Sequence, residues 1–485
     1  MSFLNKSIFE IHQAIINGKV TPIELVKESL ELAKRDDNNA FEYICEKEAL
    51  ENVKRLDPNK KNNLLFGIPV VIKDNFSTKD IPTTGSSNIL KDYIPVFSSE
   101  VVLRLENEGA IIIGKTTLDE LGMGGTGTAG HKGATFNPWD KSHTHQIGGS
   151  SCGSAAAISA GIVPLAIGSD TGDSVRKPAS YAGLVGFKPT WGRISRYGLF
   201  PFATSLDHVA YFTRNVKDSA LTLNVLAGRD DKDFSSSFEK VDDYLADIDK
   251  PISGTKIAVI RQIVDAVHNQ KIIEDFNKTI AKLRASGAIV EEVNIDQNLL
   301  KAIYPTYIII SSAESTSNNA GLDGIKYGDR KKGNTYEEVV INTRSAGFSE
   351  FIKRRFVIGS FSLLKENRDE LFVRAQKCRR LIVDAFNKVL EKYDAIYCPA
   401  SPTAAPLLKV SAISPTSDLI ISDNYLAFAN MGGFPSITLP IGFDDGLPYG
   451  ANLTSKPFSE GKLLNIANKI EDMTGLRDLI AGENK

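Results

Sequence analysis

One stretch of the chain, residues 148–176, constrains the fold more than any other, because two glycine- and serine-rich turns flank a run of small and apolar residues. Small residues at 154–160 predict a short helix, and 164–167 predicts a strand. The second turn, 168–173, leads directly into Ser174. Glycine permits backbone N–H groups to approach a ligand closely. The stretch therefore predicts a binding or catalytic site, with a tightly packed structural unit as the alternative.

The composition is that of an ordinary globular enzyme. The chain has 485 residues, of which 42% are hydrophobic and 24% charged, and its formal net charge is −2. This balance argues against a protein that binds nucleic acid by itself, since such proteins carry a basic excess. The four cysteines are far apart and form no CxxC pair, so we expect neither a disulfide framework nor a metal site. We also expect no secretory signal and no membrane span, and predict a cytoplasmic protein, with an organellar location left open.

Local patterns predict alternating helices and strands. Thr21, Pro22 and Glu24 have the spacing of a capping box with proline at the first helical position, which predicts a helix start. Residues 64–72 form an apolar run typical of a buried strand, and the segment 256–293 indicates a strand–helix–strand unit. These patterns predict an α/β fold with a mixed sheet covered by helices on both faces.

Residues 109–116 match the phosphate-loop pattern GxxxxGK[ST], but we predict no nucleotide site there. In a phosphate loop the strand precedes the motif, so that successive N–H groups point at phosphate. Here three isoleucines, 111–113, lie inside the motif and favour extended structure.

Lys73 follows directly on the apolar run at 64–72. A lysine at the end of a buried strand must be paired or neutral, because burial disfavours its charge. One interpretation is a functional amine. The other is a lysine that emerges into solvent or pairs with Asp74.

Two arrangements would supply a serine nucleophile with a base and an oxyanion site. Residues 149–153 match GxSxG, with Ser151 as the nucleophile and His208 or His268 downstream as a possible base. However, a nucleophile elbow follows an apolar strand, whereas this motif follows a polar, histidine-containing segment. The other arrangement uses Ser174 as nucleophile, with Ser150 and Lys73 behind it.

The second arrangement resembles the amidase signature hydrolases. Their signature is similar to residues 148–154, Gly-Gly-Ser-Ser-x-Gly-Ser, and 168–176, Gly-Ser-Asp-Thr-Gly-x-Ser-x-Arg, with the two serines 24 positions apart. Lys73, in Gly67-Ile-Pro-Val-Val-Ile-Lys-Asp, matches the family's catalytic lysine. The resemblance implies an amidase signature fold with a mixed central sheet and helices on both faces. It implies one amidase domain over 1–485, made of an N-terminal helical segment 1–60, a signature core 61–230 and a substrate-side and C-terminal portion 231–485.

A narrower resemblance is to the A subunits of glutamyl-tRNA(Gln) amidotransferases. It rests on Asn137-Pro-Trp-Asp140, Lys188-Pro-Thr-Trp-Gly-Arg-Ile-Ser-Arg-Tyr-Gly198, Ser205-Leu-Asp207 and Asp323-Gly-Ile-Lys-Tyr-Gly328, among others. It implies a glutaminase that supplies ammonia for converting Glu-tRNA(Gln) to Gln-tRNA(Gln). It further implies a heterotrimer with subunits B and C, in which this chain binds no cofactor directly and a partner subunit uses ATP and Mg²⁺. The tRNA would be bound through the complex.

By the same resemblance, individual residues receive roles. Lys73 is the base, Ser150, held on a cis peptide in the family, relays a proton, and Ser174 is the nucleophile. Glutamine is held by Tyr307, Arg355 and Asp423, where the arginine suits a carboxylate and the aspartate an ammonium. The oxyanion is held by backbone N–H groups of Thr171, Gly172, Asp173 and Ser174.

The sequence departs from the family pattern beside the nucleophile. Asp173 and Cys152 stand where the family has glycine, and Lys177 stands where it has glutamine. A carboxylate at Asp173 would oppose a developing oxyanion. Two alternatives therefore accompany the glutaminase interpretation: a stand-alone amidase for small carboxamides, and a catalytically weak scaffold subunit.

Overall fold

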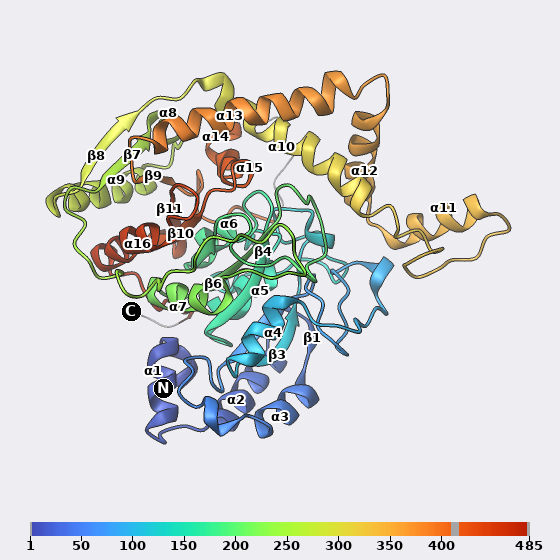
Figure 1. Ribbon diagram of the computed structural model, residues 1–485, viewed down its shortest axis with the longest axis horizontal. Helices are drawn as coiled ribbons and strands as arrows, with labels where there is room; N and C mark the ends of the chain where they lie inside the picture. The colour runs from blue at the N-terminus through green and yellow to red at the C-terminus, as the bar shows by residue number, and fades with distance from the viewer. Residues whose placement is uncertain (1, 409–416, 483–485) are drawn as a thin grey trace.

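A single eleven-stranded sheet runs through the centre of the computed structural model, which describes residues 2–408 and 417–482 (Figure 1). Its strand order is β1-β3-β2-β4-β6-β5-β10-β11-β9-β7-β8. The strands are β1 Phe41–Ile44, β2 Pro69–Lys73, β3 Ile111–Thr116, β4 Leu165–Asp170, β5 Val185–Lys188, β6 His208–Thr213, β7 Lys256–Ile260, β8 Ile289–Val293, β9 Ala395–Pro399, β10 Ser436–Asp444 and β11 Leu447–Thr454.

Helices surround this sheet. They are α1 Ile8–Ile16, α2 Pro22–Lys34, α3 Glu46–Lys54, α4 Glu100–Asn107, α5 Cys152–Ser159, α6 Arg176–Ala182, α7 Val216–Leu226, α8 Arg261–Asp265, α9 Gln270–Ala285, α10 Gln297–Asn318, α11 Tyr336–Gly347, α12 Glu350–Leu363, α13 Arg374–Leu390, α14 Ser417–Asn424, α15 Phe428–Met431 and α16 Glu460–Thr474. The predicted mixed α/β architecture is confirmed.

The sheet has two parallel sections separated by an antiparallel one, and its edge strand β1 pairs antiparallel with β3. In one parallel section β2 pairs with β3 and β4, and in the other β7 pairs with β8 and β9. Between them β6, β5, β10 and β11 run antiparallel to their neighbours. The parallel β7–β8 pair confirms the predicted strand–helix–strand unit. One sheet thus includes strands from both sides of residue 230, and the three-part division of the chain stays a prediction.

Alternate residues of each strand enter different hydrophobic clusters, as the period of two in a β-strand requires. Val70 and Ile72 of β2 pack in the cluster that includes residues of α7 and α16, whereas Val71 packs in the cluster that includes residues of α5 and α6. Lys73 shares the face of Val71. The alternation within β2 therefore directs Lys73 toward α5, where the first glycine- and serine-rich turn ends.

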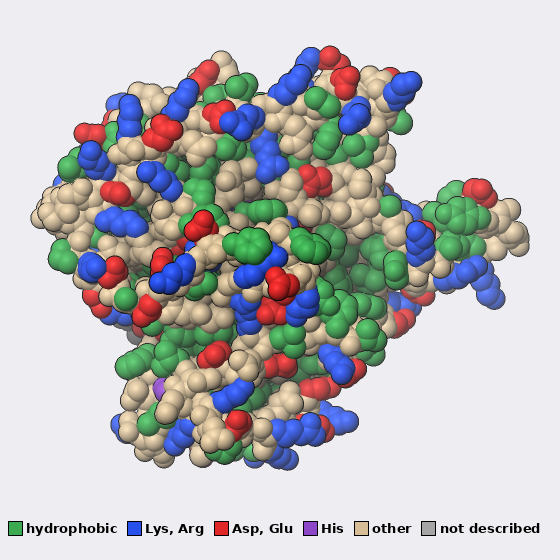
Figure 2. Space-filling view, viewed as in Figure 1, with side chains coloured by type: hydrophobic (Ala, Val, Ile, Leu, Met, Phe, Trp, Pro, Cys, Tyr) green, Lys and Arg blue, Asp and Glu red, His purple; other side chains and the backbone are tan. Residues whose placement is uncertain are grey.

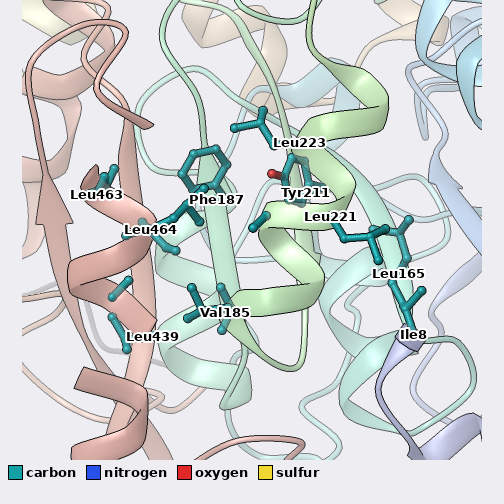
Figure 3. Packing of buried hydrophobic residues seen from close by; sticks show 14 of the residues in the cluster. Ile8, Leu165, Val185, Phe187, Tyr211, Leu221, Leu223, Leu439, Leu463 and Leu464 are labelled. Atoms are coloured by element: carbon teal, nitrogen blue, oxygen red, sulfur yellow. The ribbon is translucent and has the colours of Figure 1, made fainter. Parts of the chain in front are cut away.

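The hydrophobic cluster that contains Val70 and Ile72 joins segments that are distant in sequence. Figure 3 shows Phe187 of β5 beside Tyr211 of β6 and Leu464 of α16. The rings of Phe187 and Tyr211 have centroids 5.6 Å apart. Closing helix α16 is thereby anchored to the middle of the sheet.

A third hydrophobic cluster supports the C-terminal half. Its residues come from β7, β9 and the long helices α10, α12 and α13. The chain between α10 and α12, including α11, projects from the side of the molecule (Figure 1). α10 and α12 carry two of the predicted substrate-binding residues.

Two local predictions can be checked directly. The Thr21 side chain accepts from the Glu24 backbone N–H while the Glu24 carboxylate accepts from the Thr21 N–H, so the predicted capping box is present. Residues 111–116 form strand β3. The phosphate-loop match therefore contains a buried strand, as expected, and not an anion-binding loop.

The surface carries mixed charge. On the face in Figure 2, basic and acidic side chains are interspersed, and apolar side chains gather near the base of the projecting α11 segment. Within the described ranges, no helix combines the length and apolarity that crossing a bilayer requires.

Substitution of a buried and of an exposed phenylalanine should change the free energy of unfolding by very different amounts. Phe187→Ala should lower the free energy of unfolding by about 3–5 kcal/mol, because it opens a cavity in the central cluster. Phe234→Ala is the matched control, since Phe234 is 91% exposed. Urea denaturation followed by circular dichroism measures both variants. Equal midpoints for the two would contradict the packing described.

Candidate active site

The Lys73 amine lies at the end of β2, fully buried, within a cage of serine oxygens. Its Nζ is 2.8 Å from Ser150 Oγ, 2.8 Å from Ser151 Oγ and 2.9 Å from Ser169 Oγ. Ser150 and Ser151 precede α5, and Ser169 lies on β4, the parallel neighbour of β2. The peptide bond between Gly149 and Ser150 is cis. β2, β4 and the first turn thus meet at this amine.

Burial lowers the pKa of Lys73 from its ordinary value to about 7, against the opposing effects of Cys152 and of more distant carboxylates. No carboxylate forms an ion pair with Lys73 within the described residues. Desolvation disfavours an ammonium group that lacks a counter-charge. The amine can therefore be neutral near pH 7, as a general base must be.

The hydrogen bonds around Lys73 determine which serine can give it a proton. The Ser151 hydroxyl donates to the Ser169 carbonyl, 3.1 Å away, and Ser169 Oγ accepts from Asn75 Nδ2 at 3.0 Å. These two oxygens can accept the two N–H bonds of a neutral amine. The nitrogen lone pair then remains for the Ser150 hydroxyl. This geometry favours proton transfer from Ser150 to Lys73.

The alternative interpretation of Lys73 is wrong. Asp74 does not pair with it: the Asp74 carboxylate lies 3.2 Å from Lys115 Nζ, and both side chains are fully buried. Lys115 also donates to the Phe76 carbonyl and to Thr83. Successive residues of an extended segment point to opposite sides, so Lys73 and Asp74 face different surroundings.

Ser174 follows the second turn, directly after β4, and is 3% exposed. The Ser151 N–H donates to the Ser174 carbonyl at 3.2 Å, which holds the two serine-bearing turns together. Ser174 Oγ forms no hydrogen bond with another described residue. Its hydroxyl is therefore not committed to a structural contact.

The turn that leads into Ser174 contains backbone N–H groups that can bind a ligand. Among described residues, the backbone N–H groups of Gly172, Asp173 and Ser174 have no hydrogen-bond acceptor. Successive free N–H groups in a turn form an anion-binding concavity. This arrangement fits the predicted oxyanion site.

A buried ion pair holds this turn in shape. Arg176 Nη2 lies 2.9 Å from Asp170 Oδ1, 2.7 Å from the Gly172 carbonyl and 2.7 Å from Asn430 Oδ1. The Asp170 carboxylate also accepts from the Val175 N–H at 3.0 Å. Although burial opposes ionisation, Arg176 holds the pKa of Asp170 below its ordinary value. Because the Gly172 carbonyl is bound to Arg176, the N–H groups of the turn can face the site.

A second buried carboxylate supports the turn from the other side. Thr171 Oγ1 donates to Asp207 at 2.7 Å, and Asp207 also accepts from the N–H groups of Phe202 and Ala203.

His208, one of the two alternative bases, lies with Nδ1 2.7 Å from the Leu206 carbonyl. Burial lowers the pKa of His208 well below its ordinary value. This histidine belongs to the sheet, on β6, and is not bonded to a serine among the described residues.

Two of the predicted substrate-binding residues come from the C-terminal helices. Tyr307 of α10 covers the turn: a Cβ added at Gly172 would lie 2.9 Å from the ring carbon Cζ and 3.1 Å from the hydroxyl. Arg355 of α12 has Nη1 3.4 Å from Ser311 Oγ and 3.5 Å from Ser312 Oγ. The described residues include no acidic ion-pair partner for Arg355, so its guanidinium can receive a carboxylate.

The third, Asp423 of α14, is joined to the turn by Lys177. Lys177 Nζ lies 3.2 Å from Asp423 Oδ1 and 2.7 Å from Asp173 Oδ2. The structure thus gathers the predicted residues in one region, and their catalytic and binding roles stay predictions. The contacts of Ser151 and Ser169 with Lys73 and the Asp173–Lys177 pair were not predicted, although the i, i+4 spacing was a readable signal for the last. Ser151, the nucleophile of the GxSxG alternative, bonds to Lys73 and to the Ser169 carbonyl.

No cluster of three or more histidine, cysteine, aspartate or glutamate residues suited to a metal ion occurs in residues 2–408 and 417–482.

Comparison with known proteins gives a consistent result. The amidase family matches residues 24–464. The chain is 39% identical to the glutamyl-tRNA(Gln) amidotransferase A subunit of Pediococcus pentosaceus and 40% identical to that of Streptococcus mutans, covering 98% of this chain and 98% and 97% of those proteins. The crystal structure of the Thermotoga maritima A subunit superposes with a TM-score of 0.79 at 35% identity, over 97% of this chain and 95% of that one. A peptide amidase from Stenotrophomonas maltophilia has a TM-score of 0.80 at 25% identity, over 97% of each chain.

The site predicts a pH-dependent serine reactivity. A sulfonyl fluoride should modify Ser174, and the rate should rise tenfold per pH unit at low pH and level off above about pH 7, because only neutral Lys73 accepts a proton. Mass spectrometry of the modified peptide and the rate between pH 5.5 and 9 measure this.

Two variants complete the experiment. Lys73→Met should slow the modification by roughly 100-fold or more, as expected for loss of a general base. Ser286→Ala, at the exposed end of α9, is the control and should react normally. Modification of another serine, or a rate independent of pH, would contradict the assignment.

Proposed function

This chain belongs to the amidase family, and from that membership we propose that it is the glutaminase subunit of a glutamyl-tRNA(Gln) amidotransferase. The observation that carries the proposal is the buried Lys73 amine, bonded to Ser150 beside the turn of Ser174. Identity of 39–40% to known A subunits along almost the whole chain supports this assignment within the family.

In the proposed mechanism, Ser174 Oγ attacks the side-chain amide carbon of glutamine. The Ser174 proton passes to Ser150 as the Ser150 proton passes to neutral Lys73. The amide oxygen becomes an oxyanion, which the N–H groups of Gly172, Asp173 and Ser174 stabilise; each such donor contributes roughly 3 kcal/mol. Thr171 belongs to the same predicted oxyanion set.

Collapse of this intermediate breaks the C–N bond. The proton held by Lys73 returns through Ser150 to the leaving nitrogen, which departs as ammonia. Water then attacks the Ser174 ester by the same route, releasing glutamate and restoring the serine. Each residue ends in its starting state, so the Ser-Ser-Lys set needs no histidine.

Three side chains would hold the glutamine. Arg355, which lacks an acidic partner within the described residues, suits the α-carboxylate in a bidentate fork. Asp423 suits the α-ammonium. Tyr307, packed over Gly172, covers the reacting end of the substrate.

The other components of the reaction would belong to partners. Subunits B and C would complete a heterotrimer, and a partner would use ATP and Mg²⁺ to activate glutamate on Glu-tRNA(Gln), which reaches the ammonia through the complex. A chain with net charge −2 suits a subunit that leaves tRNA binding to others. We place this complex in the cytoplasm.

The stand-alone amidase and the weak scaffold subunit make different predictions about purification and activity. A stable complex with tRNA-binding subunits favours the amidotransferase over the stand-alone amidase. Ammonia release from glutamine by that complex then separates a glutaminase from a scaffold.

The proposal predicts separable activities in the assembled complex. Ser174→Ala should reduce ammonia release from glutamine by at least about 1,000-fold, because the nucleophile is removed. Gln-tRNA formation with added ammonium chloride should be unchanged, since the partner's chemistry is intact. Coupled ammonia detection and tRNA amidation assays measure the two, with Ser286→Ala as control. A Ser174→Ala complex that still hydrolyses glutamine would show that another residue is the nucleophile.

A further inference from the structure

A chain of three charges links the nucleophile's turn to α14. Asp173 directly precedes Ser174, and its carboxylate lies 2.7 Å from Lys177 Nζ. Lys177 Nζ also donates to the Asp423 carbonyl at 2.7 Å and lies 3.2 Å from Asp423 Oδ1. The Lys177 side chain is only 8% exposed, whereas the Asp423 side chain at the end of the chain of charges is 34% exposed.

The position of Asp173 creates an electrostatic problem that Lys177 can solve. An unpaired carboxylate next to Ser174 would repel the oxyanion that the N–H groups of the same turn stabilise. The Lys177 ammonium group, 2.7 Å from the carboxylate, opposes this repulsion, because the fields of the two charges partly cancel. The backbone supports the pair, because the Lys177 N–H donates to the Asp173 carbonyl at 2.9 Å.

Lys177 also fixes Asp423. Its two contacts, one with the carbonyl and one with a carboxylate oxygen, bind both the backbone and the side chain of that residue. Two carboxylates and one ammonium leave a net charge of −1, which can bind one further cation. The second carboxylate oxygen, Asp423 Oδ2, remains for it.

We propose that Lys177 is a positioning residue, which neutralises Asp173 beside the nucleophile and holds Asp423 in place for the substrate's ammonium group. The inference rests on the proposed glutaminase function. It assigns a role to a lysine that touches neither the substrate nor the reacting atoms, and it makes Asp173 and Lys177 one functional unit.

The test is a double-mutant cycle in the assembled complex, which compares Lys177→Gln, Asp173→Asn and the double variant with the wild type. Lys177→Gln should lower kcat for glutamine hydrolysis by roughly 10–100-fold, because Asp173 loses its counter-charge beside the nucleophile. Asp173→Asn should chiefly raise KM, because Lys177 then neutralises Asp423. The double variant, with the same net charge as the wild type, should regain most of the lost kcat.

The split between kcat and KM, and the rescue by a second substitution, separate this role from simple structural support. Lys217→Gln is the matched control, since Lys217 forms an exposed pair with Asp249 at 2.9 Å and should behave as wild type. If Lys177→Gln fails to fold but the double variant folds and is active, the pairing is supported. If both fail to fold, the charge explanation is overturned.

The outcomes distinguish this inference from the function on which it rests. An active wild-type complex in which Lys177→Gln keeps full kcat, or in which the double variant is no better than Lys177→Gln, overturns the inference alone. A wild-type complex that releases no ammonia from glutamine overturns the proposed function and the inference with it.

Discussion

The site depends on one physical constraint, the complete desolvation of the Lys73 amine. A lysine at the end of a strand is ordinarily charged, and here the sheet removes it from water without supplying an anion among the described residues. Ser150, Ser151 and Ser169 replace the lost hydration with hydroxyl oxygens that bind an amine in either protonation state. The parallel pairing of β2 with β4 is what brings the amine to the second turn, and the start of α5 brings the first. The pKa of the Lys73 amine thus depends on how the surrounding strands and turns are arranged.

Much of this arrangement was predictable from the chain itself. Glycine–serine turns and the capping box at Thr21 reflect local chemistry, and they are where expected. The strand before Lys73 is shorter than predicted, because it spans Pro69–Lys73 while residues 64–67 of the apolar run form a turn. The charge partners were not predictable in the same way. Adjacency in sequence makes Asp74 a candidate partner for Lys73, yet the alternation of an extended segment turns it toward Lys115, which belongs to β3. Nothing local to β2 reveals that register.

The departures from the family pattern illustrate the same limit. Considered singly, Asp173 is a carboxylate in the wrong place and Lys177 an unexplained substitution. Considered together in three dimensions, they neutralise each other and reach a third charge, Asp423, about 250 residues along the chain. Buried polar residues such as Arg176 and Asn430 behave likewise: each has a function in the turn only because a distant segment completes its hydrogen bonds. The polar groups of this turn are therefore held in place by hydrogen bonds from segments that are distant in sequence.

The strand order has a consequence for how the protein is made. β5, which ends at Lys188, has β6 on one side, and its other edge is covered only by β10, which begins at Ser436. While the ribosome is still producing the intervening 247 residues, that edge has no intramolecular partner. An unpaired strand edge invites association with other chains, so the nascent protein is most vulnerable to aggregation between these two points of synthesis. Asn430 and Asp423 emerge just before β10. The site around Ser174 and the covering of the β5 edge are therefore completed at nearly the same point of synthesis.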